Sequence, residues 1–264
     1  MQPLRATGTD SQPASFVLCS SKRMVPVSLP MPVTPPKPHV WEPVKLWRRG
    51  LAARVMRARV TNREFTIISN DCFGGMAYEE LGMRYDSPFV GLFVMPEDYM
   101  KLLRNLRCCQ EPLQFKTESR QERVNLWRAN VLQRAYPIGV LGDDVEVHFL
   151  HYKSRDEAAA KWERRAQRIH WDNLLVKICW HEDEHMESWL REFDAMSFTR
   201  KLALAPRAMP DVRCAVALRG YSTDGTWQYW RSHLHFDVAQ WLNTGAIRRM
   251  TWTRALDGML YWHY

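Results

Sequence analysis

Apolar and polar positions follow two periods along this chain. Beyond residue 64, short apolar runs that predict buried strands alternate with segments whose apolar residues recur every three or four positions, as in helices. The predicted strands are residues 65–69, 88–95, 138–141, 145–150, 174–180, 201–205 and 214–218. The predicted helices are residues 75–81, 96–106, 154–169, 186–196 and 236–242. Strands that alternate with helices predict a Rossmann-like α/β fold, with a mainly parallel sheet covered by helices on both faces.

The N-terminal part of the chain has a different pattern. Residues 1–40 hold eight of the fifteen prolines, and we expect a disordered, proline-rich leader there. Residues 41–63 predict a basic amphipathic helix, and residues 64–264 a single α/β domain. The apolar face of the helix consists of Val44, Trp47, Leu51, Val55 and Ala58. This face either packs on the domain or lies on an anionic membrane surface.

Charge and composition narrow the function classes. The net charge of +8 is confined to the N-terminal part, because residues 1–63 hold 11 basic and 2 acidic residues, and residues 64–264 hold 26 and 27. We therefore expect no nucleic-acid partner, since a binding domain normally carries its own basic patch. No apolar run is long enough to span a membrane. Six scattered cysteines without a C-x-x-C pair favour a reducing, cytoplasmic location, with possible contact to the inner membrane through the basic helix.

The first candidate site is the segment 69–75, which lies between a predicted strand and a predicted helix. Ligands of open α/β sheets bind at this place. We predict that Asn70, Gly74 and Gly75 bind substrate, with the glycine N–H groups at the helix N-terminus receiving negative charge. Cys72 is the candidate catalytic nucleophile, because the helix dipole favours a thiolate. The alternative is a tight turn with a buried thiol. The segment matches neither a dinucleotide fingerprint nor a P-loop.

The second candidate site is a group of ionisable residues near the strand predicted at 145–150. Asp144, Glu146 and His148 share one strand face at period two, and we predict catalytic acid–base roles for them. His151, which follows, is predicted to bind substrate. Metal binding by the same oxygen-rich group stays open, although no metal ligand is assigned. A solvent-facing edge strand would show the same alternation.

Two other features carry weaker signals. The segment from His181 to His185 satisfies the H-E-x-x-H zinc pattern, but it directly follows a predicted strand, so we expect an acidic loop. Twelve tryptophans favour either core packing or stacking on sugar rings. Residues 221–230, with His233 and His235, form either a surface loop near the site or a turn with solvated histidines.

Several stretches carry family motifs. They are FTIISNDCFGG at 65–75, SPFVGLF at 87–93, YPIGVLGDDVEVHFLHY at 136–152, KWERR at 161–165 and WDN at 171–173. Together they resemble a bacterial family whose members are often labelled exopolysaccharide biosynthesis proteins (domain of unknown function family 1919). The resemblance covers roughly residues 60–205 and implies a Rossmann-type fold. Members carry Asn where this chain has Asp71, which implies that Asp71 is not an essential base.

The resemblance and the candidate residues together predict a surface-polysaccharide enzyme. We expect a transferase that moves an acyl or similar group to a sugar. The sequence does not identify its donor or cofactor, and an acyl-CoA and a nucleotide sugar both stay open. The carbohydrate or nucleotide-sugar substrate is then its main partner. Two alternatives stay open. One is a hydrolase of glycan or ester bonds, with or without a metal, and the other is a non-catalytic sugar-binding accessory protein of polysaccharide assembly.

Overall fold

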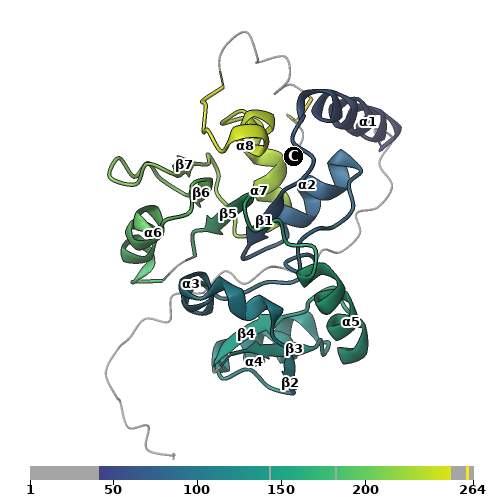
Figure 1. Ribbon diagram of the computed structural model, residues 1–264, viewed down its shortest axis with the longest axis vertical. Coiled ribbons are helices and arrows are strands. Elements are labelled where there is room, and N and C mark those ends of the chain that lie inside the picture. The colour runs from purple at the N-terminus through teal and green to yellow at the C-terminus, as the bar shows by residue number, and fades with distance from the viewer. Residues whose placement is uncertain (1–41, 143, 182, 251–259, 262–264) are drawn as a thin grey trace, which may run out of the picture.

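A parallel sheet lies at the centre of the computed structural model, which describes residues 42–142, 144–181, 183–250 and 260–261 (Figure 1). In sheet order its strands are β1 (Thr66–Ser69), β5 (Leu174–Cys179), β6 (Lys201–Ala205) and β7 (Ala215–Ala217). Helices flank both faces, which confirms the predicted α/β class. The leader predicted over residues 1–40 lies outside the described residues.

The two faces of the sheet bury two different cores, because side chains alternate along each strand. Ile67 lies opposite Leu175, and both join the core of one face; Ile68 lies opposite Val176, and both join the core of the other. The first core is covered by α1 (Glu42–Arg59), α2 (Phe73–Leu81), α7 (Gly225–Ser232) and α8 (Val238–Thr244). The second is covered by α3 (Pro96–Arg104), α5 (Arg155–Ala166) and α6 (Met186–Ala195).

A second, antiparallel sheet lies on the α3 and α5 side of the molecule, in the lower part of Figure 1. It consists of β2 (Gln114–Lys116), β3 (Ile138–Leu141) and β4 (Val145–His148), with α4 (Glu122–Trp127) next to it. The strands predicted at 138–141 and 145–150 are therefore present as the hairpin β3–β4. Neither β2 nor α4 was predicted. With 3 residues, β2 is too short and too exposed to show an apolar run, and α4, with 6 residues, is too short to show a helical period.

The strand predicted over residues 88–95 is wrong. The backbone turns at Gly91, where φ is +75°, and only Phe93 forms an isolated β-bridge, with His148 of β4. The N–H group of Val94 donates to the chain just after β1. This segment is apolar because it crosses between the two sheets and is buried there, so burial without strand pairing explains its composition.

The helix α7 was not predicted. Residues 221–230 were expected to form a loop or a turn, yet α7 begins after Asp224, whose carboxylate accepts hydrogen bonds from the N–H groups of Thr226 and Trp227. His233 directly after the helix is buried and not solvated. The other predicted strands and helices are present, with ends that differ by a few residues.

The tryptophans divide between the core and the surface. Trp162 and Trp241 are fully buried, as core packing requires, whereas Trp47 on α1 has 68% of its surface exposed. The prediction that α1 packs on the domain through the face that contains Trp47 is therefore wrong. The helix packs on the domain through Ala52 and Met56, which are buried. Contact of the exposed face with a membrane stays a prediction. In the part of the chain that the structure describes, no helix is long and apolar enough to cross a bilayer.

Substitutions on the two faces of α1 test this arrangement. Met56 is 2% exposed, and we expect Met56→Ala to lower the free energy of unfolding by about 2–5 kcal/mol, as large-to-small core substitutions do. Trp47→Ala removes a larger side chain, but we expect it to change the free energy of unfolding by less than about 0.5 kcal/mol, because this side chain is exposed. Urea unfolding of both variants is the measurement. A larger loss for Trp47→Ala would contradict the observed helix orientation.

Candidate functional site

The candidate site lies where β1 and β5 end. Asn70, the first residue after β1, links the two strand ends, because its Oδ1 accepts from the Cys179 N–H at 3.1 Å and its Nδ2 donates to Cys179 Sγ at 3.2 Å. Asn70 is buried. Both ends of its amide are thus used inside the protein. In this conformation Asn70 links the two strand ends, and its predicted role in binding substrate stays a prediction.

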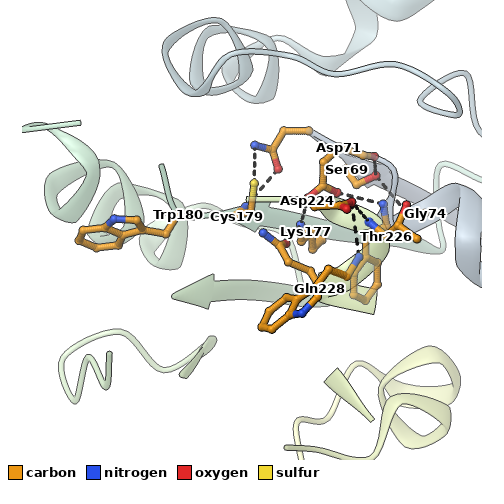
Figure 2. Close-up of polar contacts among 12 residues, drawn as sticks. Ser69, Asp71, Gly74, Lys177, Cys179, Trp180, Asp224, Thr226 and Gln228 are labelled. Carbon is orange, nitrogen blue, oxygen red and sulfur yellow. Dashed lines mark hydrogen bonds and ion pairs between the residues drawn. The ribbon is translucent and has the colours of Figure 1, made fainter. Parts of the chain in front are cut away.

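A buried ion pair lies beside this link. Lys177 of β5 is fully buried, and its Nζ contacts the Asp71 carboxylate and donates to Gln228 Oε1 at 2.6 Å (Figure 2). The other carboxylate oxygen of Asp71 accepts from the Phe73 N–H at 3.0 Å. A charge taken out of water is tolerated only when it is paired and hydrogen-bonded. Asp71 therefore has a defined task, which is to neutralise Lys177 and fix the turn that contains Cys72.

The unpredicted helix α7 completes the ion-pair environment. A Cβ atom on Gly225 would lie 2.6 Å from Asp71 Cγ and 2.7 Å from the backbone nitrogen of Cys72, so only glycine allows α7 to approach this turn so closely. The Gln228 amide is oriented by donation from Nε2 to Tyr221 Oη at 3.1 Å. Its carbonyl oxygen consequently faces Lys177.

Cys72 and His151 meet at the more accessible side of the turn. Cys72 Sγ lies 3.7 Å from His151 Nε2, although the two residues follow strands of different sheets. Cys72 is partly exposed and His151 is exposed. The crossing segment between the sheets fixes this approach, because the His151 N–H donates to the Gly91 carbonyl at 3.0 Å. The structure thus joins a residue of the first candidate site to one of the second.

Both groups of this pair are neutral near pH 7. Burial raises the pKa of the Cys72 thiol to about 12, and the carboxylates of Asp71 and Asp224 act in the same direction. Burial and the charge of Arg134 lower the pKa of His151. This environment favours the thiol over the thiolate that the helix dipole was expected to produce, and the role of Cys72 as a nucleophile stays a prediction.

The two predicted ligand-binding glycines have a packing role. A Cβ atom on Gly74 would lie 3.0 Å from Ile67 Cγ2, so this glycine lets α2 pack closely on β1. The N–H group of Gly74 donates to Ser69 Oγ at 3.3 Å. Because the Gly74 N–H already donates to Ser69 in this conformation, its predicted role in receiving substrate charge would require that hydrogen bond to be exchanged, and it stays a prediction. The predicted role of Gly75, which is partly exposed, stays a prediction.

Glu146 and His148 form a separate cluster inside the antiparallel sheet. Both side chains are fully buried, and Glu146 Oε2 lies 3.6 Å from His148 Nε2. Glu146 pairs with Lys116 and accepts from the Arg120 N–H at 2.7 Å. The alternative in which Glu146 and His148 face solvent on an edge strand is therefore wrong. Neither side chain is in contact with solvent in this conformation, and the predicted catalytic roles of both stay predictions.

The remaining residues of that prediction lie at its margin. The carboxylate of Asp144 is half-exposed and pairs with Arg120 and with Lys101, whose Nζ lies 3.3 Å away. Burial by itself raises the pKa of Asp144, but the hydrogen bonds and positive charges of Lys101 and Arg120 together outweigh it and lower the pKa below its usual value. In this conformation Asp144 belongs to a surface ion-pair network, and its predicted catalytic role finds no support in these contacts.

The histidines of the H-E-x-x-H pattern do not converge. His181 is buried with its Nε2 3.3 Å from Cys179 Sγ, whereas His185 is exposed and directly precedes α6. Burial lowers the pKa of His181 to about 4. The described residues of this segment form a turn, which confirms the predicted loop. Within the described ranges, no three His, Cys, Asp or Glu residues are placed to hold a metal ion.

Sequence reasoning missed Lys177, Asp224 and Gln228. One signal for Lys177 was present, since a single lysine interrupts the apolar run 174–180 and a charge inside a buried strand requires a partner. Asp224 before Gly225 is a typical helix N-cap that could have identified α7. No local signal identified Gln228, because its contact with Lys177 joins residues 51 positions apart.

A double-mutant cycle tests the buried pair. Lys177→Met leaves the Asp71 carboxylate buried without its partner, and we expect the free energy of unfolding to fall by about 3–5 kcal/mol. Adding Asp71→Asn removes the second charge and should restore at least half of this loss. Lys161→Met, which breaks a surface pair with Glu157, is the matched control and should cost less than about 1 kcal/mol. Equal losses in the single and the double variant would contradict a coupled pair.

Because the Cys72 thiol is neutral, we predict how its alkylation rate depends on pH. Because the pKa of Cys72 is about 12, the thiolate fraction and the alkylation rate by iodoacetamide should rise roughly tenfold per pH unit between pH 7 and 9.5. Mass spectrometry of the peptide that contains Cys72 measures this rate. The urea-unfolded chain is the control, and it should react faster at pH 7 because its thiol has an ordinary pKa. A rate that levels off below pH 8 would show a thiolate instead.

Comparison with known proteins shows the family of this chain. A family model described as "Domain of unknown function (DUF1919)" matches residues 45–247. An uncharacterized protein of Haemophilus influenzae (strain Rd) is 28% identical over 207 residues, which are 74% of this chain and 92% of that protein. The matched range is wider than the 60–205 inferred from motifs, and it takes in α7 with its glutamine. The chain belongs to the DUF1919 family.

Proposed function

We propose that this protein transfers an acyl group from a thioester donor, such as an acyl-CoA, to a sugar hydroxyl in surface-polysaccharide biosynthesis. The observation that carries the proposal is the 3.7 Å contact between Cys72 Sγ and His151 Nε2 where the parallel strands end. A nucleophile in contact with a base is the usual arrangement for covalent group transfer. The resemblance to proteins labelled exopolysaccharide biosynthesis proteins supports the pathway class, and a cytoplasmic location belongs to the same proposal.

The neutral pair suits a mechanism in which the base acts during attack. His151 takes the thiol proton as Cys72 Sγ attacks the donor carbonyl, and the donor sulfur leaves with that proton. The acyl group is then held on Cys72 as a thioester. A sugar hydroxyl next gives its proton to His151 and attacks this thioester, and the Cys72 sulfur leaves and recovers the proton. The net reaction converts a donor thioester and a sugar into a donor thiol and a sugar ester.

The buried groups beneath the pair position it. Asp71 accepts the Phe73 N–H and neutralises Lys177, so the turn that contains Cys72 is fixed from below. A proton relay through Glu146 or His148 is not part of this mechanism, since both are fully buried in the other sheet. Asp71 and Lys177 are thus positioning residues, whereas Cys72 and His151 are the proposed catalytic residues.

Acyl transfer is tested by incubating the full chain with acetyl-CoA and larger acyl-CoAs, with and without a panel of sugars. We expect a covalent acyl adduct on the Cys72 peptide and release of free coenzyme A that increases with a sugar acceptor. Cys72→Ala should form no adduct, and His151→Gln should form it about 100-fold or more slowly. His185→Gln, which changes an exposed histidine elsewhere, is the control and should behave as the wild type.

The other outcomes separate the alternatives. Release of coenzyme A that needs Cys72 but does not increase with any sugar would favour the hydrolase. Full transfer by Cys72→Ala would overturn the role of the thiol. Binding of sugars without turnover of any thioester would favour the non-catalytic accessory protein.

A further inference from the structure

The segment that follows α4 has an unusual backbone. The helix continues as a π-helical turn, Arg128–Leu132, and ends at Gln133, where φ is +50°. Among the described residues, Gln133 is the only one other than glycine with a positive φ. Such conformations cost free energy, and they are frequent at binding and catalytic sites. This observation does not depend on the Cys72–His151 contact.

An open hollow of about 520 Å³ lies against this segment. Arg128 and Arg134 line it, together with Glu118, the one acidic residue of the lining, and uncharged residues that include Asn125. The two arginines outnumber the single carboxylate. Within the described residues, neither arginine forms an ion pair with a carboxylate. Counted over its lining residues, the hollow therefore has one more positive charge than negative charge.

The walls of the hollow are held in place by hydrogen bonds. Arg128 donates to the Thr117 carbonyl at 2.9 Å and to the Tyr136 carbonyl at 3.2 Å, and its guanidinium lies 4.7 Å from the centre of the Tyr136 ring. Asn125 binds the backbone of Ser119 through both atoms of its amide, at 2.9 and 2.7 Å. A fixed guanidinium loses little conformational entropy on binding an anion.

Arg134 connects the hollow to the proposed catalytic pair. It donates to the carbonyl of Leu150 at 2.6 Å, and Leu150 directly precedes His151. Its positive charge also lowers the pKa of His151, which requires the two groups to lie near each other. One wall of the hollow is thus bonded to the residue that precedes His151.

We infer that this hollow is a subsite for the phosphate or diphosphate group of the donor, held by Arg134 and Arg128. Arginine guanidinium groups bind phosphate oxygens in a paired, planar geometry. Coenzyme A and nucleotide sugars both carry a diphosphate, so the chemistry of the hollow is shared by both donor classes. The inference rests on the proposed function for the identity of the ligand as a donor, while the binding of a diphosphate can be measured by itself.

Calorimetric titration of the full chain tests the subsite, with coenzyme A, uridine diphosphate glucose and inorganic pyrophosphate as separate ligands. We expect binding of pyrophosphate and of at least one of the two larger ligands, and the tighter of these identifies the donor class. Arg134→Gln should weaken that binding tenfold or more, and Arg134→Lys, which keeps the charge, should weaken it less. Arg155→Gln, an exposed arginine on α5, is the control and should change it less than twofold.

Because Arg134 also donates to the Leu150 carbonyl, thermal unfolding of every variant is measured alongside. Equal dissociation constants for the wild type and Arg134→Gln, or no binding of any of the three ligands, would overturn the subsite. Coenzyme A carries no acyl group, so the titration does not depend on Cys72 chemistry. Normal binding without any Cys72 adduct would overturn the proposed function alone. A Cys72 adduct from a phosphate-free thioester, with no effect of Arg134→Gln on binding, would overturn the subsite alone.

Discussion

The arrangement at the strand ends depends on one buried lysine. Lys177 is placed inside a strand whose other side chains are apolar, so its ammonium group has no access to water. Its charge must be met from within the protein, and two separate parts of the chain meet it. Asp71 comes from the turn after β1, and Gln228 comes from α7. The ion pair thereby fixes where the turn and the helix lie relative to the sheet.

The geometry of the proposed catalytic pair follows from this constraint. The turn held by Asp71 presents Cys72, and the close approach of α7 is possible because residue 225 is glycine. His151 follows β4 of the antiparallel sheet, and its imidazole contacts Cys72 from that sheet. The site is therefore formed where two sheets meet, as is common for ligand sites at the ends of parallel strands. The arginines after α4 extend the same region on the side of the antiparallel sheet.

The elements of the parallel sheet were predictable because each has a local cause. Apolar β-branched runs predicted β1 and β5, and Ser154 with Glu157 predicted the start of α5, where the serine side chain accepts the Glu157 N–H. The segment 88–95 failed the same rule, because an apolar run shows burial and not strand pairing. The start of α7 depended on a single capping residue, which periodicity does not detect.

The site was predictable only in part. The segment 69–75 and His151 were identified, since glycines, a cysteine and a histidine after strands are visible in the sequence. Their partners were not, because the contacts of Lys177 with Asp71 and of Cys72 with His151 join residues 106 and 79 positions apart. The sequence did not decide whether Glu146 and His148 are buried, for a related reason. The period-two pattern of a strand is the same whether its polar face meets solvent or is covered by charged neighbours such as Lys116.

Affinity labelling with bromoacetyl-coenzyme A tests most directly whether Cys72 lies at a donor site. Apart from Cys72, the cysteines that the structure describes are buried, and Cys19, which lies outside the described residues, is replaced by serine in the labelled protein. We predict one adduct, on Cys72, with a rate that saturates as the label concentration rises and that falls when free coenzyme A is added. A rate that stays proportional to label concentration, with no protection by coenzyme A, would contradict a donor site at Cys72.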